Sequence, residues 1–399
     1  MSETIAAPWA TKGLWPGGGE DRTLFDGSVA FPAMVLRERA LARNIRSLAD
    51  FCTRHDLSFA PHGKTTMSPQ LFARQLAEGA WGITVAMGHQ ARAARGFGVS
   101  RILIANEVLD PATLRWIADE AAGGAGEILF LVDSDEGSAA AAREGVRAGV
   151  ELPVLVDIGH AGGRTGVRHP DEAARLAHIV HDIEGVRLAG VSSYEGGLRS
   201  VAEVTDYFDG VRAITRRLRL EGVLPERPIV TAGGSAYFDR VAVELGEALA
   251  GDAQVILRSG AYVSHDDGVY VGKTAFNRIP DEGRLDAALE IWAHVVSVPE
   301  PGIAIIGMGK RDAPYDEGMP VPLRQRTADG VVSEIADRAA VTKLDDQHAY
   351  LSCEDGFAPR PGDLVCFGIS HPCTAFDKWR RVPVADDHDR ITEIIDTYF

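Results

Sequence analysis

The residue with the most distinctive chemistry in the sequence is Lys64, in the segment Pro61-His62-Gly63-Lys64-Thr65. This segment follows a short β-rich run, at the point where a strand would end. A lysine amine that is partly shielded from water can bond the aldehyde of a cofactor. An exposed lysine at a strand end is the simpler interpretation of this motif taken alone. The motif is not a phosphate-binding P-loop, because Ser58 stands where that motif requires a glycine.

Two glycine-containing turns suit the binding of a phosphate group. They are Thr231-Ala232-Gly233-Gly234-Ser235 and Ser259-Gly260-Ala261-Tyr262. Glycine lets backbone N–H groups approach phosphate oxygens closely. The alternative interpretation is that both are tight turns that need a positive φ. We favour a phosphate site, because these turns follow the seventh and eighth strand-like segments, where (β/α)8 barrels often hold phosphate.

His371 and Cys373 stand two residues apart after another β-rich run and are candidate metal ligands. Imidazole and thiolate both suit zinc. Taken alone, this pair is only half of a zinc site. Cys52 and Cys366 are expected to be packed thiols instead.

The segments that would position these residues alternate between strands and helices. The expected strands are 57–61, 82–86, 102–106, 128–133, 154–158, 188–194, 228–231 and 255–258. The expected helices are 37–55, 69–78, 89–97, 111–121, 136–148, 171–182, 201–220 and 237–250. This alternation indicates a parallel sheet with crossover helices. Eight such units favour a closed (β/α)8 barrel over an open doubly wound sheet.

The pattern changes near residue 276, so we expect an α/β barrel over residues 30–275 and a mostly β domain over residues 276–399. The expected strands of the second domain are 288–298, 303–308, 331–344, 349–353, 364–369 and 379–384, followed by a helix at 390–398. Residues 30–35 could form a strand that returns to this domain. Residues 1–29 are expected to pack on it.

Composition and charge narrow the class of protein. The 399 residues carry a net charge of −16, which argues against nucleic acid or an anionic membrane as a partner. The four cysteines are too few for a disulfide framework and indicate a reducing compartment. We see no signal peptide and no apolar run long enough to span a membrane. The sequence therefore predicts a cytoplasmic enzyme.

Taken together, the motifs resemble the D-threonine aldolase / D-serine dehydratase-like family of alanine-racemase-type (fold type III) enzymes. The resemblance extends over nearly the whole chain and rests on the order and spacing of several segments. These are 61–65, 104–107, 162–167, 188–194, the two glycine turns, 307–310, 346–348 and 371–373. Members of this family are pyridoxal-phosphate enzymes with a barrel and a C-terminal β domain. The resemblance implies the same fold, a D-amino acid substrate and a homodimer.

The resemblance also implies roles for individual residues. Lys64 is then the catalytic lysine that bonds pyridoxal 5'-phosphate. The implied cofactor-binding residues are Lys64, His62, Arg164, Tyr194, Thr231, Gly233, Gly234, Ser235, Gly260, Ala261 and Tyr262. His371 and Cys373 match the metal pair of the family, which implies a divalent metal, with Zn²⁺ favoured over Mn²⁺ or Mg²⁺.

Two positions depart from the family pattern: Thr66 and Glu195 stand where histidine is usual. Cleavage by a retro-aldol reaction needs a base beside the metal, so losing both histidines favours β-elimination. We therefore expect a dehydratase that converts D-serine, D-threonine or 3-hydroxyaspartate to a 2-oxo acid and ammonia. The alternatives are an aldolase that forms glycine and an aldehyde, and a non-catalytic pyridoxal-phosphate-binding protein.

Overall fold

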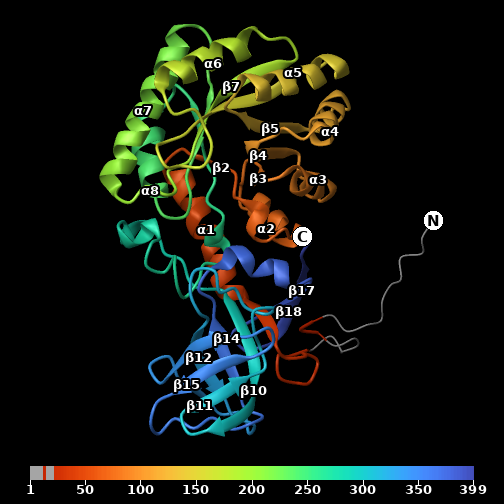
Figure 1. Cartoon of the computed structure of the whole chain (residues 1–399), viewed down its shortest axis with the longest axis vertical. Helices are drawn as coiled ribbons and strands as arrows, with labels where there is room; N and C mark the ends of the chain where they lie inside the picture. The colour runs from red at the N-terminus through yellow and green to blue at the C-terminus, as the bar shows by residue number, and fades with distance from the viewer. Residues whose placement is uncertain (1–11, 15–21) are drawn as a thin grey trace, which may run out of the picture.

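The chain forms two units in a computed structural model that describes residues 12–14 and 22–399. Figure 1 shows a unit of helices and parallel strands above a unit built mostly from antiparallel strands. The upper unit contains the elements from α1 to β9, and the lower unit contains those from β10 to β18 together with β1.

Eight parallel strands form the sheet of the upper unit in the order β2-β9-β8-β7-β6-β5-β4-β3. They are β2 (Ser58–Phe59), β3 (Ile83–Val85), β4 (Arg101–Glu107), β5 (Glu127–Val132), β6 (Leu152–Ile158), β7 (Val186–Ser193), β8 (Ile229–Ala232) and β9 (Gln254–Leu257). The sheet closes because the Trp81 N–H donates to the Phe59 carbonyl at 2.6 Å and the Thr84 N–H donates to the Pro61 carbonyl at 2.9 Å. The predicted strands and the predicted (β/α)8 barrel are confirmed.

The helices between these strands begin and end close to their predicted positions. They are α1 (Glu38–Arg54), α2 (Pro69–Ala77), α3 (Gly88–Gly96), α4 (Pro111–Ala122), α5 (Asp135–Ala148), α6 (Pro170–Asp182), α7 (Val201–Leu220) and α8 (Phe238–Arg240). The helix expected at 237–250 is irregular, since α8 continues as the π-helical turn η2 (Val241–Gly246) and then as η3 (Glu247–Leu249). Here the Arg212 guanidinium donates to the Glu244 carbonyl at 2.8 Å and competes with the helical hydrogen bond of that carbonyl.

Side chains of the barrel strands alternate between two apolar layers. Leu103, Leu129 and Leu155 belong to a small cluster inside the barrel, whereas Ile128 and Phe130 belong to the large core between strands and helices. The inner layer fills the barrel, so space for a ligand remains at the carboxyl ends of the strands.

The lower unit is a ten-stranded sheet in which β13-β12-β16-β10-β1-β17-β18 are neighbours and β11, β15 and β14 extend from β10. The strands are β1 (Ala33–Arg37), β10 (Leu289–Glu300), β11 (Ile303–Ile306), β12 (Val321–Arg326), β13 (Val332–Glu334), β14 (Ala339–Leu344), β15 (Ala349–Cys353), β16 (Leu364–Gly368), β17 (Arg381–Ala385) and β18 (Ile391–Asp396). β1 pairs antiparallel with β10 and parallel with β17, so the expected return of the N-terminal strand to this domain is confirmed.

The helix predicted at 390–398 is wrong, because these residues form β18. Ile391, Ile394 and Ile395 recur at helical spacing, but β18 pairs antiparallel with β17 along its length. Ile395 is fully buried opposite Val382. Pairing with the preceding strand therefore overrides the helical spacing of these isoleucines.

Two further differences concern the same domain. The strand β12 was not predicted, and the segment 331–344 forms the two strands β13 and β14 with a turn between them. Much of the segment 1–29 lies outside the described residues. Of its described residues, Lys12 bonds Asp312 at 2.7 Å, and Leu24 packs in a cluster with Trp292, both in the β domain.

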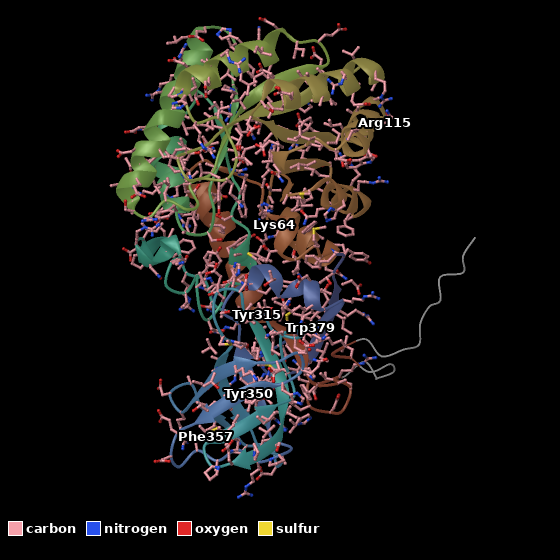
Figure 2. All side chains as sticks on the ribbon, viewed as in Figure 1. Lys64, Arg115, Tyr315, Tyr350, Phe357 and Trp379 are labelled. Atoms are coloured by element: carbon pink, nitrogen blue, oxygen red, sulfur yellow. The ribbon has the colours of Figure 1, made fainter. Side chains whose placement is uncertain are left out.

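The end of the chain lies beside α2 of the barrel (Figure 1), and Lys64 lies in the part of the barrel that faces the β domain (Figure 2). The Tyr398 N–H donates to the Met67 carbonyl at 3.0 Å. Arg74 on α2 pairs with Glu38 on α1 and with Glu393 on β18. None of the helices in the described part of the chain has the length and apolar character needed to cross a membrane.

Candidate active site

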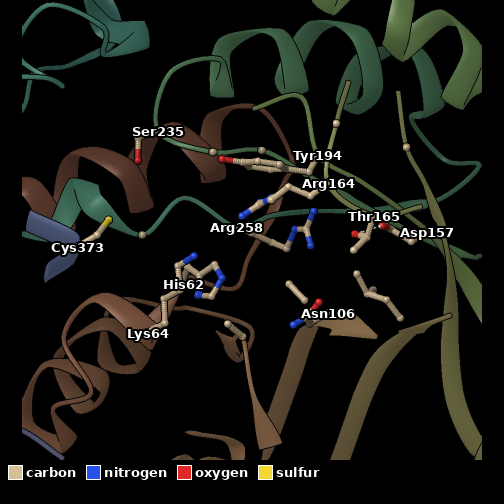
Figure 3. Close-up of a pocket in the computed structure, with 18 of the residues that line it drawn as sticks. His62, Lys64, Asn106, Asp157, Arg164, Thr165, Tyr194, Ser235, Arg258 and Cys373 are labelled. Carbon is tan, nitrogen blue, oxygen red and sulfur yellow. Dashed lines mark hydrogen bonds between the residues drawn. The ribbon is translucent and has the colours of Figure 1, made fainter. Parts of the chain in front are cut away.

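A cavity of about 290 Å³ lies at the carboxyl ends of the barrel strands (Figure 3). Most of its wall comes from segments that follow the strands, and Tyr270 and Cys373 complete it. The wall brings together most of the predicted site residues: His62, Lys64, Arg164, Tyr194, Gly233, Gly234, Ser235, Gly260 and Cys373.

Lys64 lies on the short helical turn η1 (Gly63–Thr65), just after β2. This turn packs tightly on α2, since a Cβ atom on Gly63 would lie 2.4 Å from Phe72 Cζ. Burial lowers the pKa of Lys64, and nearby guanidinium groups lower it further, whereas Cys373 raises it. The amine therefore becomes neutral at a lower pH than that of a free lysine, which a nucleophile or a base requires.

His62 and Arg258 are buried polar residues in the same wall. Burial lowers the pKa of His62 well below its usual value, and the positive charges of Lys64 and Arg258 act in the same direction. Within the described part of the chain, neither the Nδ1 atom of His62 nor Nε of Arg258 has a hydrogen-bond partner. Arg258 donates instead to the Ser193 carbonyl. Two buried polar atoms beside the cavity thus lack a partner, which is unusual for a protein interior.

Glu195, which is only 1% exposed, accepts hydrogen bonds from the glycine turn after β8. The Gly233 N–H donates to one carboxylate oxygen at 3.1 Å, and the Gly234 N–H donates to the other at 2.7 Å. The Ser259 hydroxyl donates to the Gly234 carbonyl at 2.6 Å. Ser235 follows directly and lines the cavity.

Arg164 and Tyr194 lie together on one side of the cavity, with the guanidinium carbon 4.5 Å from the centre of the ring (Figure 3). Arg164 belongs to the loop after β6, which Arg168 holds in shape. The Arg168 guanidinium donates to the carbonyls of Gly166 at 2.6 Å and Gly163 at 2.8 Å. The loop is therefore ordered by its own contacts.

Carboxylates lie on the opposite side of the cavity from Lys64. Asp157 at the end of β6 is 6% exposed and accepts a hydrogen bond from the Thr165 hydroxyl at 3.0 Å. Burial raises the pKa of Asp157, and Arg258 opposes this shift. Glu107 ends β4 behind the cavity wall, and its Oε1 atom is buried without a partner among the residues that the structure describes. Burial, followed by the charge of Asp157, raises the pKa of Glu107 to about 7.

Three predicted cofactor residues do not line the cavity: Thr231, Ala261 and Tyr262. The Thr231 hydroxyl donates to the Ile256 carbonyl at 2.9 Å within the barrel. Ala261 and Tyr262 are buried, and Gln75 donates to the Tyr262 hydroxyl at 2.9 Å. These three side chains pack in the interior, behind the wall.

His371 and Cys373 flank the start of η7 (Pro372–Thr374), which belongs to the β domain. Cys373 lines the cavity, and its Sγ atom lies 4.0 Å from the Thr65 hydroxyl. His371 lies just outside the wall, and its Nδ1 atom bonds Asp316 at 2.8 Å. A hydrogen bond with Cys373 raises the pKa of His371 to about 9, although burial opposes the shift. Within residues 12–14 and 22–399, no group of three or more His, Cys, Asp and Glu side chains is arranged to hold a metal.

The structure adds three charged residues to the site that were not predicted: Asp157, Glu195 and Arg258. The sequence carried a signal for two of them. Asp157 and Arg258 are charged residues inside or at the end of apolar strand segments, where burying a charge is costly unless the charge is paired or hydrogen-bonded. The contacts of Glu195 had no local signal, because its partners Gly233 and Gly234 follow a different strand.

The chain belongs to the alanine racemase N-terminal domain family, whose family model matches residues 36–254. A second model, described as a putative serine dehydratase domain, matches residues 288–385. The first family depends on pyridoxal phosphate. These matches, together with the similarity of the chain to enzymes named as lyases, identify it as a lyase.

Characterised relatives carry two kinds of lyase name. The chain is 27% identical to a D-threonine aldolase of Arthrobacter sp. over 354 residues, which cover 87% of this chain and 86% of the relative. It is also 27% identical to a D-threo-3-hydroxyaspartate dehydratase of Delftia sp. (strain HT23) over 342 residues, with coverages of 82% and 84%. Among solved structures, a D-threonine aldolase from Filomicrobium marinum matches with a TM-score of 0.79 and 26% identity, covering 93% of this chain and 95% of that chain.

Proposed function

We propose that the chain is a dehydratase that uses pyridoxal 5'-phosphate and a divalent metal to convert a D-β-hydroxy amino acid to a 2-oxo acid and ammonia. D-serine, D-threonine and 3-hydroxyaspartate are the candidate substrates. The observation that carries the proposal is that Lys64 of the barrel and Cys373 of the β domain line one cavity (Figure 3). An amine and a soft metal ligand thereby face the same space.

The cavity fits the cofactor on several grounds. Lys64 supplies an amine for the aldehyde, with a pKa lowered by burial. The unpartnered atoms of His62 and Arg258 provide polar contacts for a ring with polar substituents. The wall at Gly260 accepts only glycine, because a Cβ atom there would lie 2.6 Å from the His62 carbonyl oxygen. Arg164 adds positive charge for a phosphate-bearing group.

The pair His371 and Cys373 fits a metal that keeps open positions for substrate and water. A thiolate and an imidazole are a zinc-type donor set. Asp316 at Nδ1 of His371 leaves Nε2 as the ligand atom, as in the carboxylate–histidine arrangement of many metal sites. The metal would supply Lewis acidity toward the hydroxyl of a substrate.

The residues of the chain then divide the work of an elimination. The cofactor, when bound, supplies a sink for the electrons released at Cα of the substrate. Lys64 Nζ, whose pKa burial lowers, accepts the proton from Cα. Arg164 and Tyr194 hold the ligand from one side, and the β-hydroxyl leaves toward the side of Cys373. Proton and hydroxyl depart as water, and hydrolysis of the remaining enamine returns one water and releases ammonia, so no oxidant or reductant is needed.

Cleavage to glycine and an aldehyde is the second candidate, since relatives at the same identity include an aldolase. That reaction needs a base to deprotonate the β-hydroxyl. At the two positions where the family usually has histidine, Thr66 is 2% exposed, and Glu195 accepts hydrogen bonds from two glycine N–H groups. Neither is placed to act as that base, which supports elimination.

The test is product analysis after incubation of the purified chain with D-serine, D-threonine or D-threo-3-hydroxyaspartate. We expect 2-oxo acid and ammonia in equal amounts. Glycine with an aldehyde as the main product would contradict the dehydratase, and bound cofactor without any turnover would favour a binding protein. We further propose zinc as the metal and a homodimer as the assembly, to be checked by elemental analysis and light scattering.

A further inference from the structure

Glu195 is a buried carboxylate that the proposed reaction does not use. It follows β7, and both of its oxygens are bound by N–H groups of the turn after β8. Such charge-assisted hydrogen bonds are stronger than neutral ones. The turn is also held from the other side, where the Ser259 hydroxyl binds the Gly234 carbonyl.

The glycines of this turn are tightly enclosed. Gly233 has a φ of +99°, and a Cβ atom on it would lie 2.3 Å from Leu257 Cδ1. On Gly234, a Cβ atom would lie 3.2 Å from the Tyr194 ring. The turn therefore has a conformation that only glycine adopts readily, and Glu195 satisfies the two N–H groups that this conformation turns inward.

The polar groups that remain for a phosphate come from the neighbouring residues. Ser235 and Gly260 both line the cavity. Neither the Ser235 hydroxyl nor the N–H groups of Ser235 and Gly260 have a hydrogen-bond partner among residues 12–14 and 22–399. These donors follow adjacent strands, β8 and β9, and so lie on the same side of the barrel.

We infer that Glu195 is a positioning residue for the phosphate site: it binds Gly233 and Gly234 so that Ser235 and Gly260, rather than the glycine pair, present their donors to the phosphate. This inference rests on the proposed use of pyridoxal 5'-phosphate. It also explains why glutamate stands here where the family usually has histidine: a carboxylate accepts hydrogen bonds from two N–H groups at once, whereas a neutral imidazole accepts one.

The test compares the binding of pyridoxal 5'-phosphate with that of pyridoxal, which has the same aldehyde but no phosphate. The full-length chain is freed of cofactor, and each dissociation constant is measured by absorbance. The ratio of the two constants reports the phosphate contacts alone, because Lys64 reacts with the same aldehyde in both. The variants are Glu195→Ala, Glu195→Gln and Ser235→Ala, with the exposed Glu226→Ala as the control.

We expect Glu195→Ala to reduce the preference for the phosphate form about tenfold or more, because two buried N–H groups lose their partner and the turn shifts. Glu195→Gln, with one acceptor oxygen, should give a smaller loss, and Ser235→Ala should also reduce the preference. Glu226→Ala should leave it unchanged. Circular dichroism checks the fold, and Glu195→Gln carries the test if Glu195→Ala does not fold.

A gain in preference would overturn the inference, because it would mean that Glu195 competes with phosphate for the glycine N–H groups. An unchanged preference in both Glu195 variants would overturn it as well. A wild-type chain that prefers the phosphate form but has no lyase activity would contradict the proposed function alone. A wild-type chain without that preference would contradict both.

Discussion

The barrel and the β domain build the cavity in different ways. The barrel contributes residues from the ends of most of its parallel strands, so its part of the wall is spread around the whole opening. The β domain contributes Cys373 from η7, which packs on η1 of the barrel next to Lys64. Under the proposed function, cofactor binding belongs to the barrel and metal binding to the β domain. The two should therefore be separable by mutation.

The largest effect is expected in the barrel, from Lys64→Ala. Turnover should fall by at least about 10³-fold, because both the covalent attachment and the base are lost. The visible absorbance of bound cofactor should disappear with it. Lys273→Ala removes an exposed lysine and serves as the control. If the absorbance persists in the Lys64 variant, another amine holds the cofactor.

Removal of the metal is expected to have the next largest effect and to leave the barrel intact. Treatment with a chelator, or Cys373→Ser, should lower turnover about 100-fold, because a hydroxyl is a poorer zinc ligand than a thiolate. The cofactor absorbance should not change. The matched control is Cys353→Ser, on β15. Full activity after verified loss of metal would contradict the Lewis-acid role and the division between the domains.

A smaller effect is expected from Asp316→Asn, which keeps the shape of the residue that binds His371 but removes its charge. Metal affinity should fall about tenfold, as is typical for the carboxylate partner of a ligating histidine. Competition with a chromophoric chelator measures this affinity. Asp337→Asn, an exposed position of the same domain, is the control. Equal affinities in the two variants would place His371 outside the metal site.

The smallest effect concerns stability and lies in the barrel. Since the pKa of Glu107 is raised from 4.5 to about 7, folding favours its protonated form. The contribution of Glu107 to the free energy of unfolding should therefore fall as the pH rises from 4.5 to 7, and Glu107→Gln removes this contribution. At pH 8, we expect the free energy of unfolding of Glu107→Gln to exceed that of the wild type by about 1 kcal/mol, a figure reduced from the full pKa shift because the side chain is partly exposed. At pH 5, the difference between the two should be smaller. Urea unfolding measures the difference, and the same gain at both pH values would contradict the raised pKa.

The sequence predicted the barrel better than the β domain, for a physical reason. Each barrel strand is a short apolar run between helices with clear starts, such as Pro111 of α4, so local patterns suffice. In the β domain, the strand conformation of β18 depends on its pairing with β17, whereas its isoleucines recur at the spacing of a helix. β12 alternates apolar and charged residues weakly and was missed.

The site shows the same contrast. The wall residues that directly follow strands, such as Lys64, Gly234 and Gly260, could be found by position alone. The contact of Glu195 with Gly233 could not, because it joins two loops that come together only when β7 pairs with β8. Tyr262 was expected at the cofactor, but its hydroxyl lies behind the wall with Gln75. Which side of a turn faces the cavity is decided by packing that the motif does not encode.

The position of β1 constrains how the molecule can be divided. β1 leaves the ribosome before any part of the barrel, yet it fits between β10 and β17, which are both made after the barrel. A cut between the two family matches, after residue 287, would leave β1 on the barrel fragment and expose two unpaired strand edges on the other. Such edges invite aggregation. A separately expressed β domain would therefore need residues 33–37 supplied, either as a fused strand or as an added peptide.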